Sequence, residues 1–275
     1  MRIMTKTDAL KLFKTPHMKK DRKPLILVAN DDGYNSNGIR ALVKAARKFG
    51  DVLVAAPREH QSGQSSAITF ATPLRAVKCH EEPGLTVWAV NGTPADCVKL
   101  ALDQLLGERT PDLALSGINH GFNMGVSVLY SGTMGAAFES CVHGIPSIAF
   151  SYGDALFDEQ ASACLPMVEK VIDRVLKGGL PRGVCLNVNI PKTETMPKGI
   201  KITTACMGHW ASEFERRVDP TNREYYWMTG YYEPDNPQDD TTDMYWTDRG
   251  WVSVTPTRAD QTDHPSMGLV ADLLL

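Results

Sequence analysis

The sequence lacks long hydrophobic runs and any strong excess of charge of one sign. No apolar stretch in its 275 residues approaches the ~18 residues that a membrane-spanning helix needs. None near the start has the form of a signal-peptide core. We therefore expect a cytoplasmic protein with no membrane partner. The formal net charge is −3, so we also expect no binding to a nucleic-acid duplex.

Cysteine is absent from the patterns that would signal zinc or a disulfide framework. The six cysteines are widely separated, with no C-x-x-C pair and no histidine at zinc-site spacing. None lies in a context that activates a catalytic thiol. We predict reduced, mostly buried side chains that act as small apolar residues: Cys79, Cys97, Cys141, Cys164, Cys185 and Cys206.

Residues 1–23 are expected to form a flexible extension ahead of the fold. The first 17 residues carry four basic side chains and one acidic side chain. The segment that begins at Met18 would itself make a sensible protein start. Translation from Met1 or from Met18 fits the sequence equally well.

Residues 24–205 alternate between short apolar runs and amphipathic helical patterns. This alternation predicts an α/β fold, a doubly wound, mostly parallel Rossmann-like sheet. Apolar runs predict strands, and 3.6-residue periodicity predicts helices. The predicted strands are 25–29, 51–56, 86–90, 111–115, 146–151 and 184–190, and the predicted helices are 38–50, 93–106, 132–143 and 159–176.

Residues 206–275 differ in character and are expected to form a carboxyl-terminal appendage. Ten of the chain's 21 aromatic residues lie between Gly208 and Trp251, without clean helical periodicity. Because Tyr and Trp are enriched at interfaces, the segment favours a subunit contact over a substrate pocket. A strand at 251–256 and a short helix at 266–274 are expected to close the chain.

Two adjacent carboxylates, Asp31 and Asp32, follow the first predicted strand. In open α/β sheets, ligands bind at the carboxyl ends of the strands. Neighbouring side chains on a strand face opposite ways, so both acids reach one ligand only if the chain turns, which Gly33 allows. A divalent cation would offset their repulsion. A polar loop or helix cap is the simpler alternative.

Two further loops follow other predicted parallel strands at the same edge. One carries Ser62, and the other, residues 116–133, carries Asn119 and Asn123 among four glycines. A loop of that length inside a compact domain is unusual without a binding role. The segment Ser131-Gly132-Thr133 begins a helix, where hydroxyls and free backbone N–H groups would bind an anion. A helix N-cap would explain one of these hydroxyls equally well.

Oxygen ligands beside an anion site indicate Mg²⁺ or Mn²⁺ acting on a phosphate ester. A metal-activated water would attack phosphorus, with Asp31 or Asp32 as a candidate general base. A covalent role for Asp31 is a second hypothesis, although aspartyl-phosphate enzymes place their second acid two residues later. A non-catalytic, metal-dependent nucleotide-binding protein is a third. His60 and His120 lie on the site loops, where a surface role or a local hydrogen bond is expected.

The ordered motifs resemble the SurE family of metal-dependent 5′-nucleotidases and acid phosphatases. They include ILVANDDGYNSNGI, VAAPREHQSG, VNGTPADCV and PDLALSGINHGFNMGVSVLYSGTMGAA, followed by LNVNIP and WVSVTPTRADQT. The resemblance implies hydrolysis of nucleoside 5′-monophosphates, with 3′-nucleotides and polyphosphate as further candidate substrates. It also implies one divalent ion per subunit.

The resemblance assigns residue roles as well. It implies that Asp31, Asp32, Ser62 and Asn119 bind the metal and that Ser131, Gly132 and Thr133 contact phosphate. Asn119 and Asn123 are also expected to contact the substrate. Asp260 and His264 are expected to contribute to the site, with His264 as a candidate general acid, or to subunit contacts. An extended hairpin and a carboxyl-terminal segment exchanged between subunits would give a homodimer or a dimer of dimers. The stretch from Trp210 to Arg249 resembles the family only weakly.

Overall fold

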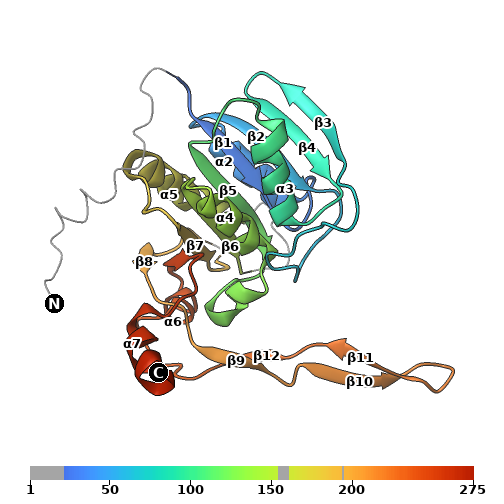
Figure 1. Ribbon diagram of the computed structural model, residues 1–275, viewed down its shortest axis with the longest axis vertical. Coiled ribbons are helices and arrows are strands. Elements are labelled where there is room, and N and C mark those ends of the chain that lie inside the picture. The colour runs from blue at the N-terminus through green and yellow to red at the C-terminus, as the bar shows by residue number, and fades with distance from the viewer. Residues whose placement is uncertain (1–21, 154–160, 194) are drawn as a thin grey trace, which may run out of the picture.

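A nine-stranded sheet forms the centre of the structure, a computed structural model that describes residues 22–153, 161–193 and 195–275. Its strand order is β3-β4-β2-β1-β5-β6-β7-β13-β8 (Figure 1). Six consecutive strands run parallel: β4 (Leu85–Val90), β2 (Asp51–Pro57), β1 (Leu25–Ala29), β5 (Leu113–His120), β6 (Ser147–Tyr152) and β7 (Val184–Ile190). The predicted doubly wound α/β fold is confirmed. Most of the predicted amino-terminal extension lies outside the described residues.

Helices cover both faces of the sheet (Figure 1). Alternate residues of the fully buried strand β1 face opposite ways. Ile26 packs in one cluster with α2 (Asn37–Ala46) and α5 (Leu165–Gly178). Leu27 packs in another with α3 (Pro94–Leu100) and α4 (Gly132–Val142). Burial on both faces explains why this strand reads as an uninterrupted apolar run.

The structure corrects two local predictions and adds a strand that was not predicted. The predicted helix 93–106 ends as α-helix at Leu100 and continues as a π-helical turn, Ala101–Leu105. Strand β3 (Ala76–Glu82), antiparallel to β4, was missed because its sequence is polar and it lies exposed at the sheet edge. The predicted helix 159–176 is a 3₁₀ turn, Ala161–Cys164, followed by α5, and its first two residues lie outside the described segments.

The loop predicted at 116–133 is shorter than expected. Strand β5 continues to His120 through an irregularity in its pairing with β6, between Ser116 and Asn119. A 3₁₀ helix, Gly125–Leu129 (η2), then precedes α4. An extra residue in one strand of a pair changes the direction in which the following side chains point. The glycine-rich sequence therefore marks an irregular strand end as well as a loop.

The last strand belongs to the central sheet. Strand β13 (Val252–Arg258) pairs antiparallel with β7 and parallel with β8 (Ile200–Ile202). Its first four residues are buried, which is why it joins the sheet. The part of the chain expected as an appendage, 206–275, thus contributes one strand to the core, and α6 (Asp243–Thr247) packs against it.

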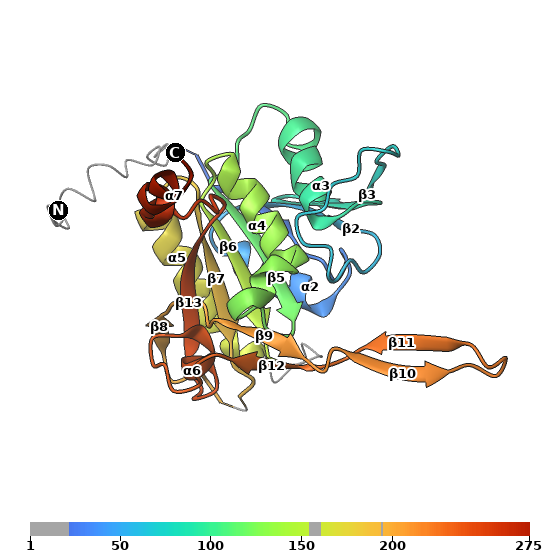
Figure 2. The same ribbon diagram turned by 60° about the horizontal axis from the view of Figure 1, so that its bottom comes forward.

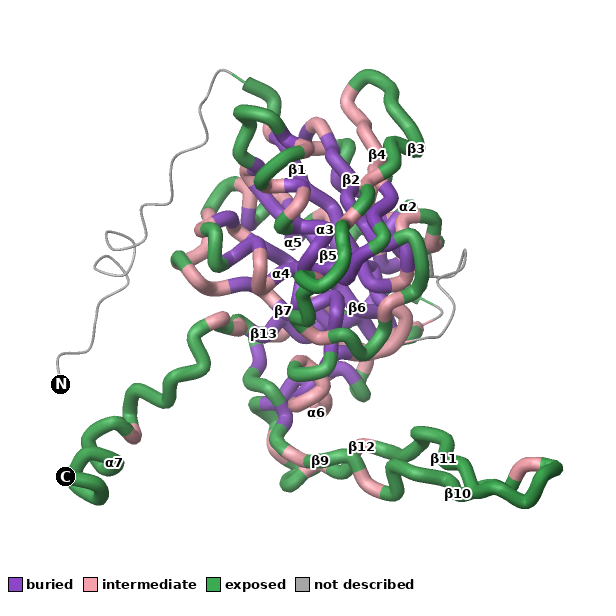
Figure 3. The backbone as a smooth tube through the Cα atoms, turned by 45° about the vertical axis from the view of Figure 1, so that its right-hand side comes forward, coloured by how far each residue is buried: buried purple, intermediate pink, exposed green. Residues whose placement is uncertain are grey.

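A narrow two-stranded arm projects from the core (Figures 1 and 2). It consists of β9 (Gly208–Ala211), β10 (Phe214–Val218), β11 (Glu224–Met228) and β12 (Tyr231–Pro234), with β9 paired to β12 and β10 to β11. Figure 3 shows it largely exposed, as is the terminal helix α7 (Met267–Leu274). Among the described helices, none is long and apolar enough to cross a membrane.

Candidate active site

Asn30 builds the turn that brings the two carboxylates to one place. Its Nδ2 donates to the carbonyl of Gly33 (3.0 Å) and to Oγ of Ser36 (2.9 Å), and its Oδ1 accepts from Gly33 N (3.2 Å). Gly33 has φ +103°, a conformation that L side chains rarely adopt. Asp31 is only 3% exposed, and the side chain of Asp32 is 1% exposed.

The first turn of α4 lies against Asp31. The Thr133 hydroxyl donates to Asp31 Oδ1 at 2.6 Å. A Cβ built on Gly132 would lie 2.9 Å from Asp31 Cβ, so only glycine permits this approach. The Ser131 hydroxyl accepts from Met134 N as the N-cap of the helix. Among the described contacts, the N–H groups of Gly132 and Thr133 have no acceptor, so this helix start can receive an anion.

The other two loops meet the same pair of acids. Gln61 N donates to Asp31 O at 2.7 Å, which brings the loop of the exposed Ser62 against Asp31. His120 N lies 3.4 Å from Asp32 Oδ2. Asn119 Nδ2 donates to the carbonyls of His120 and Gly121, and the described contacts leave its Oδ1 oxygen without a donor. The four predicted metal ligands therefore come from two loops and the end of strand β5, at one edge of the sheet.

Burial destabilises the charged form of both acids. It raises the pKa of Asp31 to about 6, against the lowering effect of the Thr133 hydrogen bond and with a further increase from Asp32. Burial also raises the pKa of Asp32, with His120 and His60 acting in the other direction. Asp32 Oδ1 is buried without a hydrogen-bond partner. Two buried carboxylates, an unsatisfied oxygen and neutral oxygen donors together fit a divalent cation.

Both site-loop histidines face Asp32, which the sequence did not indicate. Nδ1 of His120 is 3.3 Å and Nδ1 of His60 is 3.5 Å from Asp32 Oδ1. A single histidine in a polar loop carries no signal of such a contact. Only the meeting of the loops after β2 and β1 with the end of β5 brings the two rings together.

Asn123 anchors the segment that leads into η2. Its N–H donates to Asn189 Oδ1, its Nδ2 donates to Ser151 Oγ, and its carbonyl accepts from Asn187 Nδ2. These four polar residues are buried. Its side-chain amide therefore has a structural role in tying this loop to β6, and its contact with the substrate stays a prediction.

His264 is not brought to the other site residues within one chain. Because β13 runs antiparallel to β7, its last residue, Arg258, pairs with Val184 at the amino end of β7. The chain therefore leaves the sheet at the edge opposite Asp31. Figure 2 shows α7 at that end of the core, away from the arm. His264 Nε2 contacts Asp260 Oδ2 at 2.8 Å in an exposed segment.

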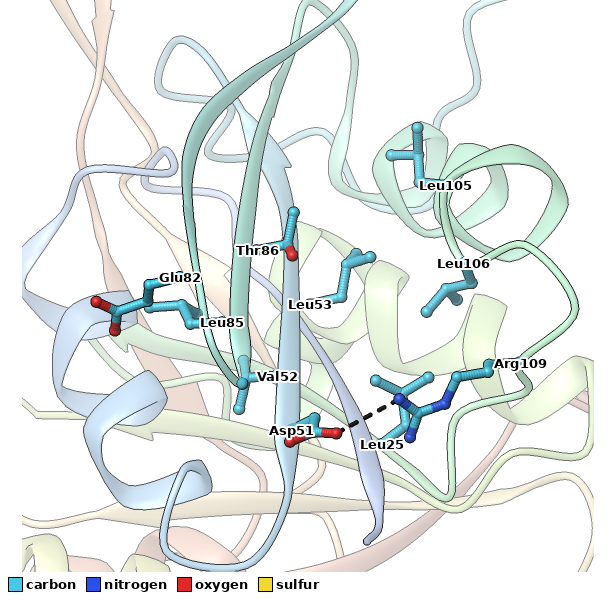
Figure 4. A pocket seen from close by; sticks show the side chains of 11 residues that line it. Leu25, Asp51, Val52, Leu53, Glu82, Leu85, Thr86, Leu105, Leu106 and Arg109 are labelled. Atoms are coloured by element: carbon cyan, nitrogen blue, oxygen red, sulfur yellow. Dashed lines mark hydrogen bonds and ion pairs between the residues drawn. The ribbon is translucent and has the colours of Figure 1, made fainter. Parts of the chain in front are cut away.

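A cavity of about 470 Å³ adjoins the carboxylates. It is open and mostly polar, and its lining comes from the turn after β1 and the loop after β2: Asp32, Gly33, Tyr34, Asn35, Ser36, Arg58, Glu59 and His60. A second cavity, of about 240 Å³, lies at the amino ends of β1 and β2 (Figure 4). Its Asp51 pairs with Lys23 (2.8 Å) and Arg109 (3.4 Å), so its main charges neutralise one another.

Fold and site together define a doubly wound α/β protein with an oxygen-rich site at the carboxyl edge of its parallel strands. The family model of survival protein SurE matches residues 26–212. The chain belongs to the SurE family, as its motifs predicted.

Similar proteins cover nearly the whole chain. A protein of Phocaeicola vulgatus named 5′-nucleotidase SurE is 43% identical over 250 residues, 91% of this chain and 96% of its own. One of Christiangramia forsetii with the same name is 45% identical over 247 residues, 88% of this chain and 94% of its own. The crystal structure of the SurE protein from Aquifex aeolicus superposes with a TM-score of 0.78 at 36% identity, covering 91% of this chain and 99% of that one.

Proposed function

We propose that this protein is a divalent-metal-dependent phosphomonoesterase that hydrolyses nucleoside monophosphates to nucleoside and phosphate. The names of its relatives support a nucleotidase. The observation that carries the proposal is the contact between the Asp31 side chain and the first turn of α4, made by Thr133 and Gly132. It places a buried carboxylate pair directly beside a helix amino terminus, the arrangement that a metal ion and a phosphate group would share.

Each side chain has a defined part in this proposal. Asp31 and Asp32 hold one Mg²⁺ or Mn²⁺ per subunit, with Ser62 and the free Oδ1 of Asn119 as neutral ligands. When bound, such an ion supplies Lewis acidity toward a phosphoryl oxygen and lowers the pKa of a water. Asp31 would be the candidate general base.

The helix start and the cavity position the substrate. The free N–H groups of Gly132 and Thr133 bind phosphate oxygens and favour the growing negative charge. Ser131 shapes this turn as the N-cap. The cavity beside Asp32, of about 470 Å³, has the size of a small-molecule site and would offer polar groups to a ribose and a base.

The arm and α7 support a homo-oligomer. Several large apolar side chains on these two elements are mostly exposed: Phe214, Tyr226, Trp227, Met228, Leu269 and Leu273. Such surfaces mark contacts with another protein, and we propose a second copy of this chain, as a homodimer or a dimer of dimers. Asp260 and His264 would act in such an assembly at the site of a neighbouring subunit or in its contacts.

Phosphate release from a panel of nucleoside monophosphates tests the function. Release should require Mg²⁺ or Mn²⁺ and stop in excess EDTA. Asp31→Asn should lower kcat by orders of magnitude and keep the wild-type circular dichroism spectrum. Tight nucleotide binding without any phosphate release would instead support a nucleotide-binding protein, and a trapped phosphoenzyme would support covalent catalysis by Asp31.

A further inference from the structure

Two buried thiols meet where the end of α4 packs on the sheet. Cys141 lies in the last turn of α4 and Cys185 near the start of β7, and both belong to one apolar cluster. Cys141 is 1% and Cys185 0% exposed. Their side chains share a hydrogen bond, and both are free cysteines. The other described cysteines lie in different clusters or outside them.

The shared hydrogen bond makes the two thiols chemically unequal. Together with the backbone N–H of Ala259, and against the opposite effect of burial, it lowers the pKa of the Cys141 thiol. The same bond and burial raise the pKa of the Cys185 thiol. Cys185 therefore keeps its proton and donates it to the sulfur of Cys141. Cys141 is the member of the pair that more readily becomes a thiolate, the form that reacts with oxidants.

The position of Cys141 gives an oxidant a route to its sulfur. The next residue, Val142, ends α4 and is 58% exposed. Helix ends open locally at a small cost in free energy, so the last turn can uncover this sulfur while the core stays folded. Cys185 is held in a strand that is paired on both sides, with β6 and with β13. An oxidant therefore reaches Cys141 first.

We propose that Cys141 and Cys185 form a reversible disulfide bond when the protein meets a peroxide, and that this bond slows the reaction at the other end of α4. The Cys141 thiolate attacks one peroxide oxygen, the O–O bond breaks, and a sulfenic acid forms as hydroxide leaves. The Cys185 thiol then attacks the sulfenic sulfur, so the S–S bond forms and the hydroxyl leaves as water with the thiol proton. Hydroxide takes up the proton that Cys141 released, so two thiols are oxidised and one peroxide is reduced to water.

The disulfide would act on the candidate active site through α4. Bonded sulfur atoms lie much closer together than two thiols in contact, so bond formation draws α4 and β7 together. Strand β7 is fixed within the sheet, whereas α4 packs on the surface of the sheet, so the helix moves. Its first turn carries the 2.6 Å bond from Thr133 to Asp31 and the close approach of Gly132. Densely packed interiors transmit such displacements.

Peptide mapping and kinetics on the full-length protein provide the test. The protein is treated with hydrogen peroxide, quenched with catalase, alkylated and digested with chymotrypsin, which cleaves after Phe150 and so separates Cys141 from Cys164. Phosphate release from AMP with Mn²⁺ is measured before oxidation, after oxidation and after added dithiothreitol. The variants are Cys141→Ala and Cys185→Ala. Cys164→Ala is the matched control, because Cys164 is a buried thiol in another cluster.

The wild type and Cys164→Ala should yield a peptide linked through Cys141 and Cys185. Their phosphate release should slow at least about tenfold, since a shift of about 1 Å at a site can cost ~100-fold in rate. Dithiothreitol should restore the rate, because it reduces a disulfide but not oxidised methionine. Cys141→Ala and Cys185→Ala should keep their rates in peroxide.

The effect on phosphate release rests on the proposed function, whereas the disulfide does not. Absence of the linked peptide from the oxidised wild type would overturn the inference, and this measurement needs no variant to fold. Linkage with an unchanged rate would overturn the action through α4. Linkage in a protein that never releases phosphate would support the disulfide and overturn the proposed function.

Discussion

The hydroxyl of Thr133 and the carboxylate of Asp31 lie 102 positions apart in the chain and are joined by a buried 2.6 Å hydrogen bond. Thr133 is fully buried and Asp31 nearly so. The bond fixes one carboxylate oxygen against the first turn of α4. Thr133 therefore orients Asp31. Because its hydroxyl is used in this bond, only the backbone N–H of Thr133 remains free to bind phosphate.

Replacing Thr133 with valine should lower kcat roughly 10- to 100-fold and weaken metal binding, because groups that orient metal ligands have effects of that size. Valine keeps the buried volume and removes the donor. Thr133→Ser retains the hydroxyl and should recover most of the activity. Steady-state kinetics with titrated Mn²⁺ checks both variants, and wild-type kinetics in Thr133→Val would contradict the orienting role.

Replacing Gly132 with alanine should reduce phosphate release at least tenfold, by about 1.4 kcal/mol or more in transition-state stabilisation. The new Cβ would lie 2.9 Å from Asp31 Cβ, which has no room to swing aside. Gly178→Ala is the control, because no atom lies within 4 Å of the corresponding Cβ at the end of α5. Equal activities of the two variants would show that the close approach of Gly132 to Asp31 does not matter for catalysis.

The metal-free protein should lose stability as the pH rises from about 4 to about 6. Burial raises the pKa of Asp31 from 3.8 to about 6, so the folded chain keeps a proton that the unfolded chain has released. The free energy of unfolding then falls with pH, by on the order of 3 kcal/mol for this group. Urea unfolding in EDTA at pH 4.5 and 7 measures the effect.

In Asp31→Asn, the free energy of unfolding should decrease less between pH 4.5 and 7, since this variant lacks the titrating carboxyl group. Adding Mn²⁺ at pH 7 should raise the unfolding midpoint of the wild type much more than that of the variant. A wild type and variant with identical pH dependence would exclude Asp31 as the source.

Replacing Asp243 with asparagine should destabilise the fold by about 1–3 kcal/mol. The buried carboxylate accepts hydrogen bonds from Gly125 N (2.9 Å), Cys206 N (2.9 Å) and Met244 N (2.8 Å). In the asparagine variant, the side-chain NH₂ group would face at least one of these N–H donors and could not accept its hydrogen bond. Asp235→Asn, at an exposed position, should be neutral. Chemical denaturation compares the two variants.

Shortening the arm should lower the oligomeric mass. A variant in which residues 212–229 are replaced by a short Gly-Ser turn removes the exposed aromatic side chains of β10 and β11. Light scattering coupled to size-exclusion chromatography should show a smaller species than the wild type. An unchanged mass would assign the subunit contact to another surface, with α7 as the next to test.

The core of the fold was predictable because buried strands and buried helix faces need apolar residues in a recognisable pattern. Strand β1 is apolar throughout since helices cover both of its faces. Helix α3 begins where Thr93 and Asp96 form a capping box around Pro94. The edge strand β3 left no such mark, because an exposed polar strand satisfies no hydrophobic pattern.

The site residues show the same difference between features that the local sequence marks and features that depend on contacts between distant segments. Asp31, Asp32, Asn119 and Thr133 could be singled out from the sequence because each follows a recognisable strand or begins a helix. His60 and His120 were judged unremarkable, since a ring contact between separate loops has no sequence period. The hydrogen bond between the Asn123 amide and Ser151 was not indicated either, because it joins a loop to a strand that comes later in the chain.

The sequence by itself determined the layered fold, the adjacent carboxylates and the helix start that follows them, because these depend on local hydrophobic pattern, turn chemistry and capping. Tertiary structure alone decided which loops meet. The antiparallel direction of β13 carries His264 to the far edge of the sheet, and the meeting of three strand ends sets two imidazoles on Asp32. Such contacts follow from strand order and direction, which no single segment specifies.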